Sequence, residues 1–412
     1  MKVLLINKFL YPKGGDAIVT FNTGKLLKEK GHKVAYWGMR HEKNLEFKYE
    51  VFFVDKVDYK TSGFKTSISF VLKILYSLEA KNKIKRLLSH ESFDIIHLHN
   101  FAHQISPSIL HVFKKRNIPV VMTSHDYKLV CPSYSMLVDG VPCERCKNSK
   151  YYWCFVKKCT KNSYLKSFIN VVEMYLHHKI LHIYDDIDIF ISPSMFLKEK
   201  LKEMGFKHKI EYLPNCIYPG EFIPKYENNG KSICYFGRLS HEKGLVTLIK
   251  AMKGLDDVEL KIIGDGQIKE KLKHYIEDHG VKNIRFLGYK TGNDLDNEIK
   301  NSSAVVIPSE WYENNPRTVL EAFALGKPVI GARIGGIPEL VKDADTGYTF
   351  EAGNAGDLRE KIMDLISSPE KIVQMGKNAR KFVEEKFNAE KHYKELMRLY
   401  QLAIEKNKGN LK

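Results

Sequence analysis

The chain has 412 residues, of which 43% are hydrophobic and 28% charged, and its formal net charge is +17. This length predicts two or three domains with their own cores, and the composition excludes disordered and fibrous proteins. No apolar run is long enough to cross a bilayer and the first residues lack a signal-peptide cleavage site, so we expect a cytoplasmic protein with at most peripheral contact with the inner face of the cell membrane. The positive charge favours an anionic partner such as a phosphorylated ligand, nucleic acid or acidic membrane.

The first 38 residues predict a strand, a glycine loop, a helix and a second strand. The first strand covers 3–6, and the loop covers 11–16 with Gly14 and Gly15 side by side. Two adjacent glycines let backbone N–H groups approach a ligand closely, although most glycine pairs are simple turns. The spacing is not Gly-x-Gly-x-x-Gly, so the dinucleotide fingerprint is absent.

A long helix is predicted over 61–88, and it carries several cations. They are Lys73, Lys81, Lys83, Lys85 and Arg86. A basic amphipathic helix can lie on an anionic membrane, but such a pattern is more often a helix packed on a sheet with a solvated basic face. We favour the packed helix for most of its length and keep membrane binding as the alternative.

Histidines follow two predicted buried strands. His97 and His99 end the strand over 94–99, and His125 follows the strand over 120–123. Ligands of open α/β sheets bind at the carboxyl ends of strands, so all three are candidates for a site. A structural role in the core is an equal alternative for His97 and His99.

Five cysteines lie within residues 131–159, and Cys143 and Cys146 form a Cys-x-x-Cys. This spacing is typical of a zinc knuckle or a redox pair. Stable disulfides are not expected in the cytoplasm, so a metal site is favoured over cross-links. A nucleic-acid-binding zinc module is the weaker alternative, and we do not expect a nucleic acid as the partner.

A second α/β region follows the linker at 217–231. Its first strand, 232–236, leads into Gly237 and Arg238, and Lys243 follows in the same loop. Two cations between a strand end and a helix start can neutralise a diphosphate, whereas most such cations are simply solvated. Further strands near 258–263, 284–287, 304–307 and 328–332 alternate with helices and predict a parallel sheet; Gly264 ends the first of them.

Residues 308–339 predict a loop, a helix, a buried strand and a second loop. We expect Asn315 to be the N-cap of that helix and Pro316 its first residue, with Gly326 as its left-handed C-terminal cap. A helix start is an anion site, and Glu313 and Glu321 lie on either side of it, so the segment suits a diphosphate flanked by two sugars.

Glu313 and Glu321, with Arg238 and Lys243, resemble the Glu-x7-Glu motif and cation pair of retaining family 4 glycosyltransferases of the GT-B fold. The resemblance implies two Rossmann-like α/β domains with parallel sheets across a central cleft. We expect an acceptor-side domain at 1–216, a nucleotide-sugar domain at 217–387, and a C-terminal helix at 388–412 that crosses back.

The same resemblance implies residue roles. Arg238, Lys243 and the helix start would stabilise the leaving diphosphate; Glu321 would hold ribose hydroxyls and Glu313 hexose hydroxyls, while His125 would contact the sugar. Gly15 is preferred over Gly14 as the loop residue facing the diphosphate. The donor-binding set is Gly14, Gly15, Gly237, Arg238, Lys243, Gly264, Asn315, Pro316, Arg317, Thr318, Val319 and Glu321, and the catalytic set is His125, Arg238, Lys243 and Glu313.

Some family members also resemble this chain in its cysteines. On that basis we expect one structural zinc on Cys131, Cys143, Cys146 and Cys159, with Cys154 spare, holding an irregular loop near the acceptor.

The implied reaction transfers a hexosyl unit from a nucleotide sugar to a hydroxyl of a carbohydrate or lipid-linked acceptor, with retention and no catalytic metal. Two alternatives stay open. One is a phosphorylase or nucleotide-sugar epimerase of the same fold, and the other is a non-enzymatic binder of nucleotides or RNA.

Overall fold

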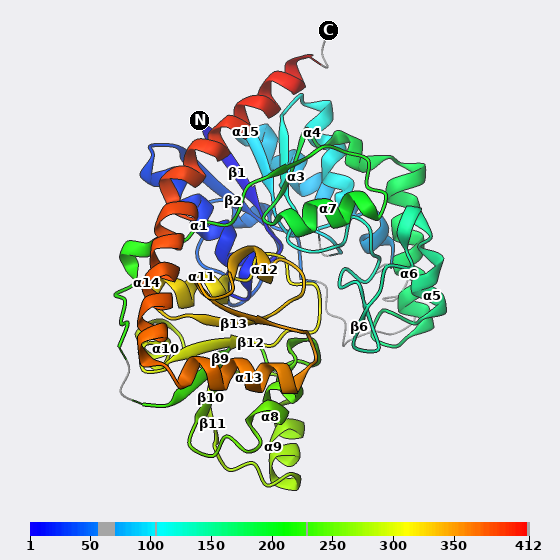
Figure 1. Cartoon of the computed structure of the whole chain (residues 1–412). Coiled ribbons are helices and arrows are strands. Elements are labelled where there is room, and N and C mark those ends of the chain that lie inside the picture. The colour runs from blue at the N-terminus through cyan, green and yellow to red at the C-terminus, as the bar shows by residue number, and fades with distance from the viewer. Residues whose placement is uncertain (57–70, 104, 228–229, 410–412) are drawn as a thin grey trace. The chain divides into compact units, whose positions relative to one another are not determined.

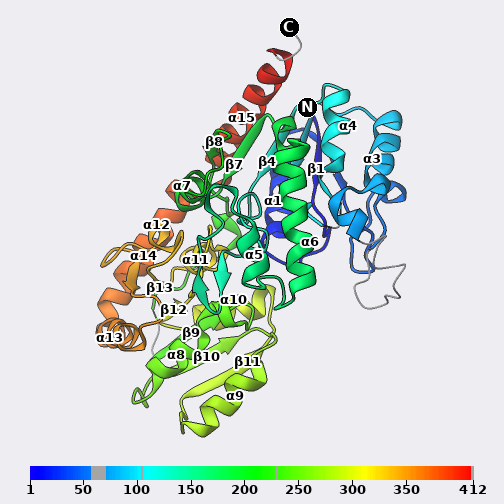
Figure 2. The same cartoon turned by 90° about the vertical axis from the view of Figure 1, so that its right-hand side faces the viewer.

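The structure is a computed structural model that describes residues 1–56, 71–103, 105–227 and 230–409. The chain divides into two compact units. The first contains Met1–Ser135, Cys143–Pro214 and His392–Lys412, and the second contains Met136–Pro142 and Asn215–Lys391. Each unit is built on one parallel sheet with helices packed against it (Figures 1 and 2).

The sheet of the first unit has the strand order β2-β1-β3-β4-β7-β8, and every neighbouring pair is parallel. Its strands are β1 Lys2–Ile6, β2 Lys33–Trp37, β3 Ile95–Leu98, β4 Val120–Thr123, β7 Ile189–Ser192 and β8 Ile210–Tyr212. The inner strands β3, β4 and β7 are buried along their whole length. Burial on both faces is why they appear in the sequence as continuous apolar runs.

The sheet of the second unit has the order β11-β10-β9-β12-β13-β14, again all parallel. Its strands are β9 Ser232–Phe236, β10 Glu259–Ile263, β11 Ile284–Gly288, β12 Ala304–Ile307, β13 Val329–Ala332 and β14 Gly347–Phe350. The predicted α/β fold with two parallel sheets is confirmed. The strand β14 was not predicted.

The helices alternate with these strands, as parallel connections require. In the first unit they are α1 Gly15–Glu29, α3 Leu78–His90, α4 Leu110–Lys115, α5 Tyr152–Val156, α6 Tyr164–Tyr175 and α7 Met195–Glu203. In the second unit they are α8 Leu245–Met252, α9 Lys269–Asp278, α10 Gly292–Lys300, α11 Arg317–Ala324, α12 Ile337–Leu340, α13 Ala355–Ile366 and α14 Pro369–Lys386. The last helix, α15 Ala389–Gly409, belongs to the first unit from His392 onward. None of the helices in the described ranges is long and apolar enough to cross a membrane.

The helix predicted over 61–88 is not continuous. Its first part, up to residue 70, lies outside the described residues. Residues 71–75 are helical, the chain then leaves the helix at 76–77, and α3 begins at Leu78 with Ser77 as its N-cap. The Ser77 hydroxyl accepts a hydrogen bond from the N–H of Ala80, and such a cap starts a new helix rather than extending the old one.

Candidate functional site

In each sheet the first strand lies inside the sheet: the next strand or strands in the sequence extend the sheet on one side of it, and the later strands extend it on the other side. In the second unit β9 lies between β10 and β12, so the segments that follow β9 and β12 leave the sheet at the same edge. Ligands of open α/β sheets bind at this kind of reversal, outside the carboxyl ends of the strands. The segment after β9 contains Arg238 and Lys243, and the segment after β12 contains Glu313.

Two glycines bring these segments together. Gly244 has φ +66°, and a Cβ at this residue would collide with the carbonyl oxygen of Pro308. Gly335 has φ +61° and lies against the backbone of Glu313, and the N–H of Gly336 donates to the Glu313 carbonyl at 2.7 Å. Only glycine permits this close approach at such a backbone conformation, so both positions fix the segment that carries Glu313.

Lys243 and Glu313 form a partly buried ion pair, with Nζ 2.6 Å from Oε1. The Ser309 hydroxyl donates to the same carboxylate oxygen at 2.7 Å. Burial alone would raise the pKa of Glu313, but the charge and hydrogen bond of Lys243, with the Ser309 hydroxyl, hold this pKa below its ordinary value. The Lys243 ammonium also lies 5.4 Å from the ring centroid of Trp311. The ammonium is thus held in one place, and it still has N–H donors for a ligand.

Arg238 is held more loosely. Its guanidinium donates to Glu242 Oε1 at 2.6 Å and to the Ser240 hydroxyl at 3.2 Å, and its side chain is 65% exposed. Part of the guanidinium is held by these two hydrogen bonds, and the rest is exposed. The exposed N–H groups can form hydrogen bonds with a phosphate while the bonds to Glu242 and Ser240 stay in place.

Helix α11 begins one residue later than predicted. Pro316 is the N-cap, with φ −68° and ψ 112°, and Arg317 is the first helical residue. The prediction was wrong because the cap lies in the extended conformation, which proline also favours. The C-terminal end matches the prediction, since Gly326 has φ +74°. Val319 packs its side chain into the core and donates its N–H to the Pro316 carbonyl at 3.1 Å, whereas Thr318 is partly exposed.

Unpartnered polar atoms gather at the start of α11. Arg317 donates to Glu321 Oε1 at 2.7 Å through one terminal nitrogen, while the other, Nη1, is buried without a hydrogen-bond partner in the described part of the chain. Oδ1 of Asn315 is buried in the same way. A buried donor without a partner is costly, so these atoms indicate a bound polar group at this helix start.

Gly237 and Gly264 serve the sheet itself. Both have φ near +145°, at 148° and 142°, and a Cβ on Gly264 would collide with the Gly237 carbonyl. Their need for glycine is therefore explained by the packing of two strand ends, and their contact with a donor stays a prediction.

The corresponding reversal in the first unit lies beside β1, between β2 and β3. The loop after β1 ends at Gly14 and α1 begins at Gly15, so the loop ends two residues earlier than the predicted range of 11–16. A Cβ on Gly15 would meet no atom within 4 Å, so internal packing does not require glycine here. The open space fits a ligand approaching the backbone, which stays a prediction for both glycines.

The three candidate histidines form a stack. The ring centroids of His97 and His99 are 4.4 Å apart and those of His99 and His125 are 5.2 Å apart. Nδ1 of His99 lies 2.9 Å from Nε2 of His125, and one of these two nitrogens donates to the other. Burial lowers the pKa of all three, that of His97 to about 3, so the stack is neutral at pH 7.

The members of the stack differ in their partners. His97 has a hydroxyl on each nitrogen, Thr123 and Tyr400, both at 2.8 Å, which makes it a satisfied core histidine. Nε2 of His99 is buried without a hydrogen-bond partner among the described residues. His99 and His125 both line a cavity of the first unit. His99 and His125 are therefore the cavity-lining members, and His97 holds β3 and β4 to α15.

The wall of this cavity also carries charge. Lys128 lines it and pairs with Glu173 of α6, with Nζ 2.7 Å from Oε2 and both side chains buried. Burial favours the neutral carboxyl, but the charge of Lys128 outweighs it and lowers the pKa of Glu173 to about 2. The Lys128 ammonium is thus balanced by Glu173, and the carboxyl of Asp126, whose pKa is raised mainly by burial, also lines the cavity.

The cysteines of 131–159 lie near one another: burial raises the pKa of the Cys146 thiol, and the nearby Cys131, Cys154 and Cys143 thiols raise it further. All seven cysteines of the chain are free thiols, and in the ranges described no group of three or more His, Cys, Asp or Glu side chains is placed to hold a metal ion. The Cys154 and Cys159 thiols form a hydrogen bond with each other, so the cysteine that we expected to be spare has a partner. Zinc on Cys131, Cys143, Cys146 and Cys159 stays a prediction, and elemental analysis of untagged protein checks it. One zinc per chain is expected, and metal-free protein would contradict it.

Several contributing residues escaped the sequence analysis. Ser309 had a signal, because it lies four residues before Glu313 in the same loop. Glu242 had one too, as the i+4 neighbour of Arg238. Tyr400 had none, since its contact with His97 spans 303 residues.

Two family models match the chain in succession. The model of Glycosyltransferase Family 4 matches residues 13–220, and the model of Glycosyl transferases group 1 matches residues 221–382. The uncharacterized glycosyltransferase MJ1178 of Methanocaldococcus jannaschii is 27% identical over 328 residues, which are 80% of this chain and 81% of that protein. The N-acetyl-alpha-D-glucosaminyl L-malate synthase of Bacillus anthracis is 25% identical over 398 residues, 92% of each chain.

A solved structure has the same fold. Anabaena Alr3699/HepE in complex with UDP-glucose superimposes with a TM-score of 0.66 over 97% of this chain and 99% of that chain, at 16% identity. With two matching family models, relatives along the whole length and two parallel sheets, the chain belongs to the group 1, family 4 glycosyltransferases of the GT-B fold.

Proposed function

We propose that this glycosyltransferase moves a hexosyl unit from a nucleoside diphosphate sugar to a hydroxyl of a carbohydrate or lipid-linked acceptor, with retention at the anomeric carbon. The synthesis of a cell-surface polysaccharide or glycolipid is the role we propose for it. The observation that carries this proposal is the group of cations after β9 and at the start of α11, within one unit and beside the sheet reversal.

The second unit would bind the donor through these cations. A diphosphate adds negative charge as its bond to the sugar breaks, and fixed cations stabilise that charge without moving. Lys243 is held by Glu313, and Nη1 of Arg317 has no partner among the described residues. Arg238 is open to solvent on one side. HepE has been solved with UDP-glucose, which supports a nucleoside diphosphate hexose as the donor.

Glu313 and Glu321 would hold sugar hydroxyls. Each carboxylate has one oxygen engaged by a cation, Oε1 in both cases, and a carboxylate can accept further hydrogen bonds. We assign the hexose to Glu313 and the ribose to Glu321. Retention would follow by departure and attack on one face of the sugar, because the described residues offer no evident nucleophile for a covalent intermediate.

The first unit would bind the acceptor, and its His125 would contact the transferred sugar. Neutral imidazoles both donate and accept hydrogen bonds, as a sugar hydroxyl does. His99 and His125 present such rings to the cavity of that unit. We also propose that no catalytic metal takes part, since Arg238 and Lys243 supply the positive charge, and activity is then expected to persist in EDTA.

The test is a thermal-shift panel of nucleoside diphosphate sugars, with free diphosphates and inorganic phosphate as controls. A ligand that binds the folded state raises the melting temperature by mass action. We expect one nucleoside diphosphate sugar to raise it in the wild type but not in Lys243→Ala, and we expect transfer only with an acceptor present. A requirement for phosphate, or sugar conversion without acceptor, would identify a phosphorylase or epimerase instead.

A further inference from the structure

The outer surface of α5 and α6 in the first unit is apolar. Six large side chains of these two helices are 39–69% exposed. They are Tyr152, Phe155, Val156, Tyr164, Leu165 and Phe168, which we call the α5–α6 surface. Scattered apolar residues are normal on proteins, but adjacent ones mark an interaction site.

Three aromatic side chains of this surface, Phe155, Tyr164 and Phe168, pack together. The Phe155 ring lies 5.2 Å from Tyr164 and 6.1 Å from Phe168, measured between centroids. The two helices lie side by side in both views (Figures 1 and 2). Helix α6 also buries Val171 and Met174 on its inner side. The helix therefore has two apolar sides, and only the inner side is buried within the unit.

The chain segment that carries most of this surface is basic. Residues 145–166 contain no Asp or Glu, and their cations are Arg145, Lys147, Lys150, Lys157, Lys158, Lys161 and Lys166. Lys158 lies 4.5 Å from the centroid of Tyr164, so charge and aromatic surface are continuous. Among the described residues, no ion pair involves Lys147, Lys157 or Lys166.

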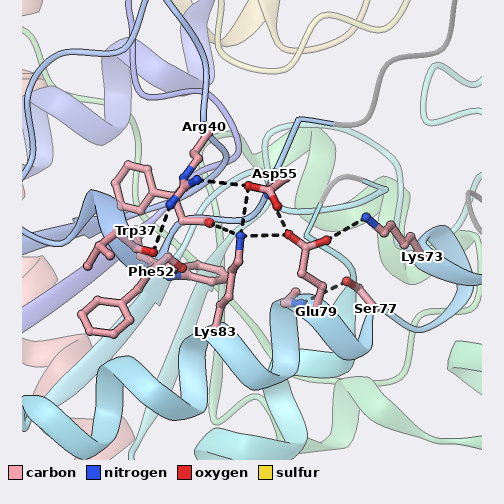
Figure 3. Close-up of polar contacts among 11 residues, drawn as sticks. Trp37, Arg40, Phe52, Asp55, Lys73, Ser77, Glu79 and Lys83 are labelled. Carbon is pink, nitrogen blue, oxygen red and sulfur yellow. Dashed lines mark hydrogen bonds and ion pairs between the residues drawn. The ribbon is translucent and has the colours of Figure 1, made fainter. Parts of the chain in front are cut away.

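The basic segment singled out in the sequence is different. Figure 3 shows that Lys73 and Lys83 are both held by Glu79, at 2.7 and 3.0 Å, and that Lys83 also pairs with Asp55 at 3.1 Å. Lys81 donates to the Tyr76 hydroxyl at 2.8 Å. Two of the five cations of the expected membrane helix, Lys73 and Lys83, are thus paired with carboxylates within the protein.

We infer that the α5–α6 surface docks on an anionic lipid bilayer. Aromatic rings suit the bilayer interface, and lysines near them suit acidic headgroups. A complementary protein patch would need acidic residues around an apolar centre, whereas a bilayer offers both over any area. Helix α6 carries this surface on its outer side and Glu173, beside the acceptor cavity, on its inner side.

The test is sedimentation of the full chain with vesicles of phosphatidylglycerol and phosphatidylcholine, or of phosphatidylcholine alone. We expect binding to the anionic vesicles only, weakened by salt. Leu165→Ser with Phe168→Ser, and Lys157→Ala with Lys166→Ala, should each reduce it about tenfold. Ile223→Ser with Met363→Ser removes exposed apolar surface elsewhere, and Lys85→Ala with Arg86→Ala removes charge from α3; both controls should bind as the wild type does.

Equal binding to both vesicle types, no binding at low salt, or an equal loss in the control variants would overturn the inference. Salt-sensitive RNA binding lost in the same α5–α6 variants, with no vesicle binding, would assign the surface to nucleic acid instead. The inference does not depend on the proposed reaction: the donor-induced thermal shift of the second unit should be unchanged in the α5–α6 variants.

Discussion

The two units use the same sheet arrangement with different side chains at the strand ends. In the second unit the segments beside the reversal hold charges in pairs, Lys243 with Glu313 and Arg317 with Glu321. In the first unit the corresponding edge holds the neutral rings of His99 and His125, whose pKa values burial lowers, beside the buried pair of Lys128 and Glu173. A charged ligand such as a diphosphate fits the first kind of site, and a neutral hydroxyl fits the second.

The comparison shows that the same sheet arrangement can carry different ligand chemistry. The side chains that follow the strands determine which charged or neutral groups each edge would suit. Both sheets are six-stranded and parallel. In both, the strand order changes direction beside one strand, β1 in the first unit and β9 in the second. Only the residues that follow the strands differ. Substitutions at these positions should therefore affect donor binding in one unit and the acceptor step or stability in the other.

The largest effect is expected from removing the cations of the second unit. Lys243→Ala and Arg238→Ala should each lower transfer ten- to hundredfold, because a charged hydrogen bond in a partly dry site contributes roughly 1.5–3 kcal/mol. Initial rates at saturating acceptor measure this, and circular dichroism checks folding. Lys253→Ala, an exposed lysine of the same unit, is the matched control. Near wild-type turnover in the double variant would end the assignment to a diphosphate.

The two glutamates should separate by kinetic parameter. Glu313→Gln should lower kcat about tenfold, because it releases Lys243 from its carboxylate partner beside the reacting sugar. Glu321→Gln should raise the donor KM by a similar factor and leave kcat unchanged, because ribose is held equally before and during transfer. Steady-state kinetics over donor concentration distinguish them. Identical effects on kcat would contradict the separate roles.

The histidine stack gives a contrast within the first unit. His125→Ala should lower transfer about tenfold while the donor-induced thermal shift stays, because a neutral hydrogen bond to the sugar is lost. His97→Gln should leave turnover near wild type, since both His97 nitrogens bond to Thr123 and Tyr400. Rates and melting temperatures of the two variants provide the measurement. If His97→Gln is the less active of the two, the placement of the ligand at His99 and His125 is wrong.

Strands and the charged site of the second unit could be predicted because their signals are local. The strand over 232–236 is one continuous apolar run, and Arg238 and Lys243 follow it directly. The strand β8 was missed because it has only three residues, two of them partly exposed, and β14 because it begins at a glycine and includes the partly exposed Tyr348. The start of α11 shifted by one residue because proline serves both as a cap and as a first helical residue.

The rest depends on contacts that no local pattern shows. Neutralisation of Lys73 and Lys83 requires Glu79 and Asp55, and the second of these is 28 residues from Lys83. The choice between a core and a cavity-lining histidine depends on Tyr400, which α15 brings to His97. Alternating histidines on one strand indicate a shared face, but not which of them has its partners.

The smallest effect is expected on stability against pH. Burial lowers the pKa of His97 to about 3, while an unfolded histidine has a pKa near 6.5. Below pH 6.5 the unfolded chain therefore binds a proton that the folded chain excludes, so the free energy of unfolding falls as pH drops from 6.5 toward 3. The loss amounts to about 1.4 kcal/mol per pH unit for each such histidine. Denaturant titrations of the wild type and His97→Gln at pH 7.5 and 5.0 measure it. The variant should lose less stability on acidification by about 2 kcal/mol, and parallel losses would show that the His97 ring is charged in the folded protein.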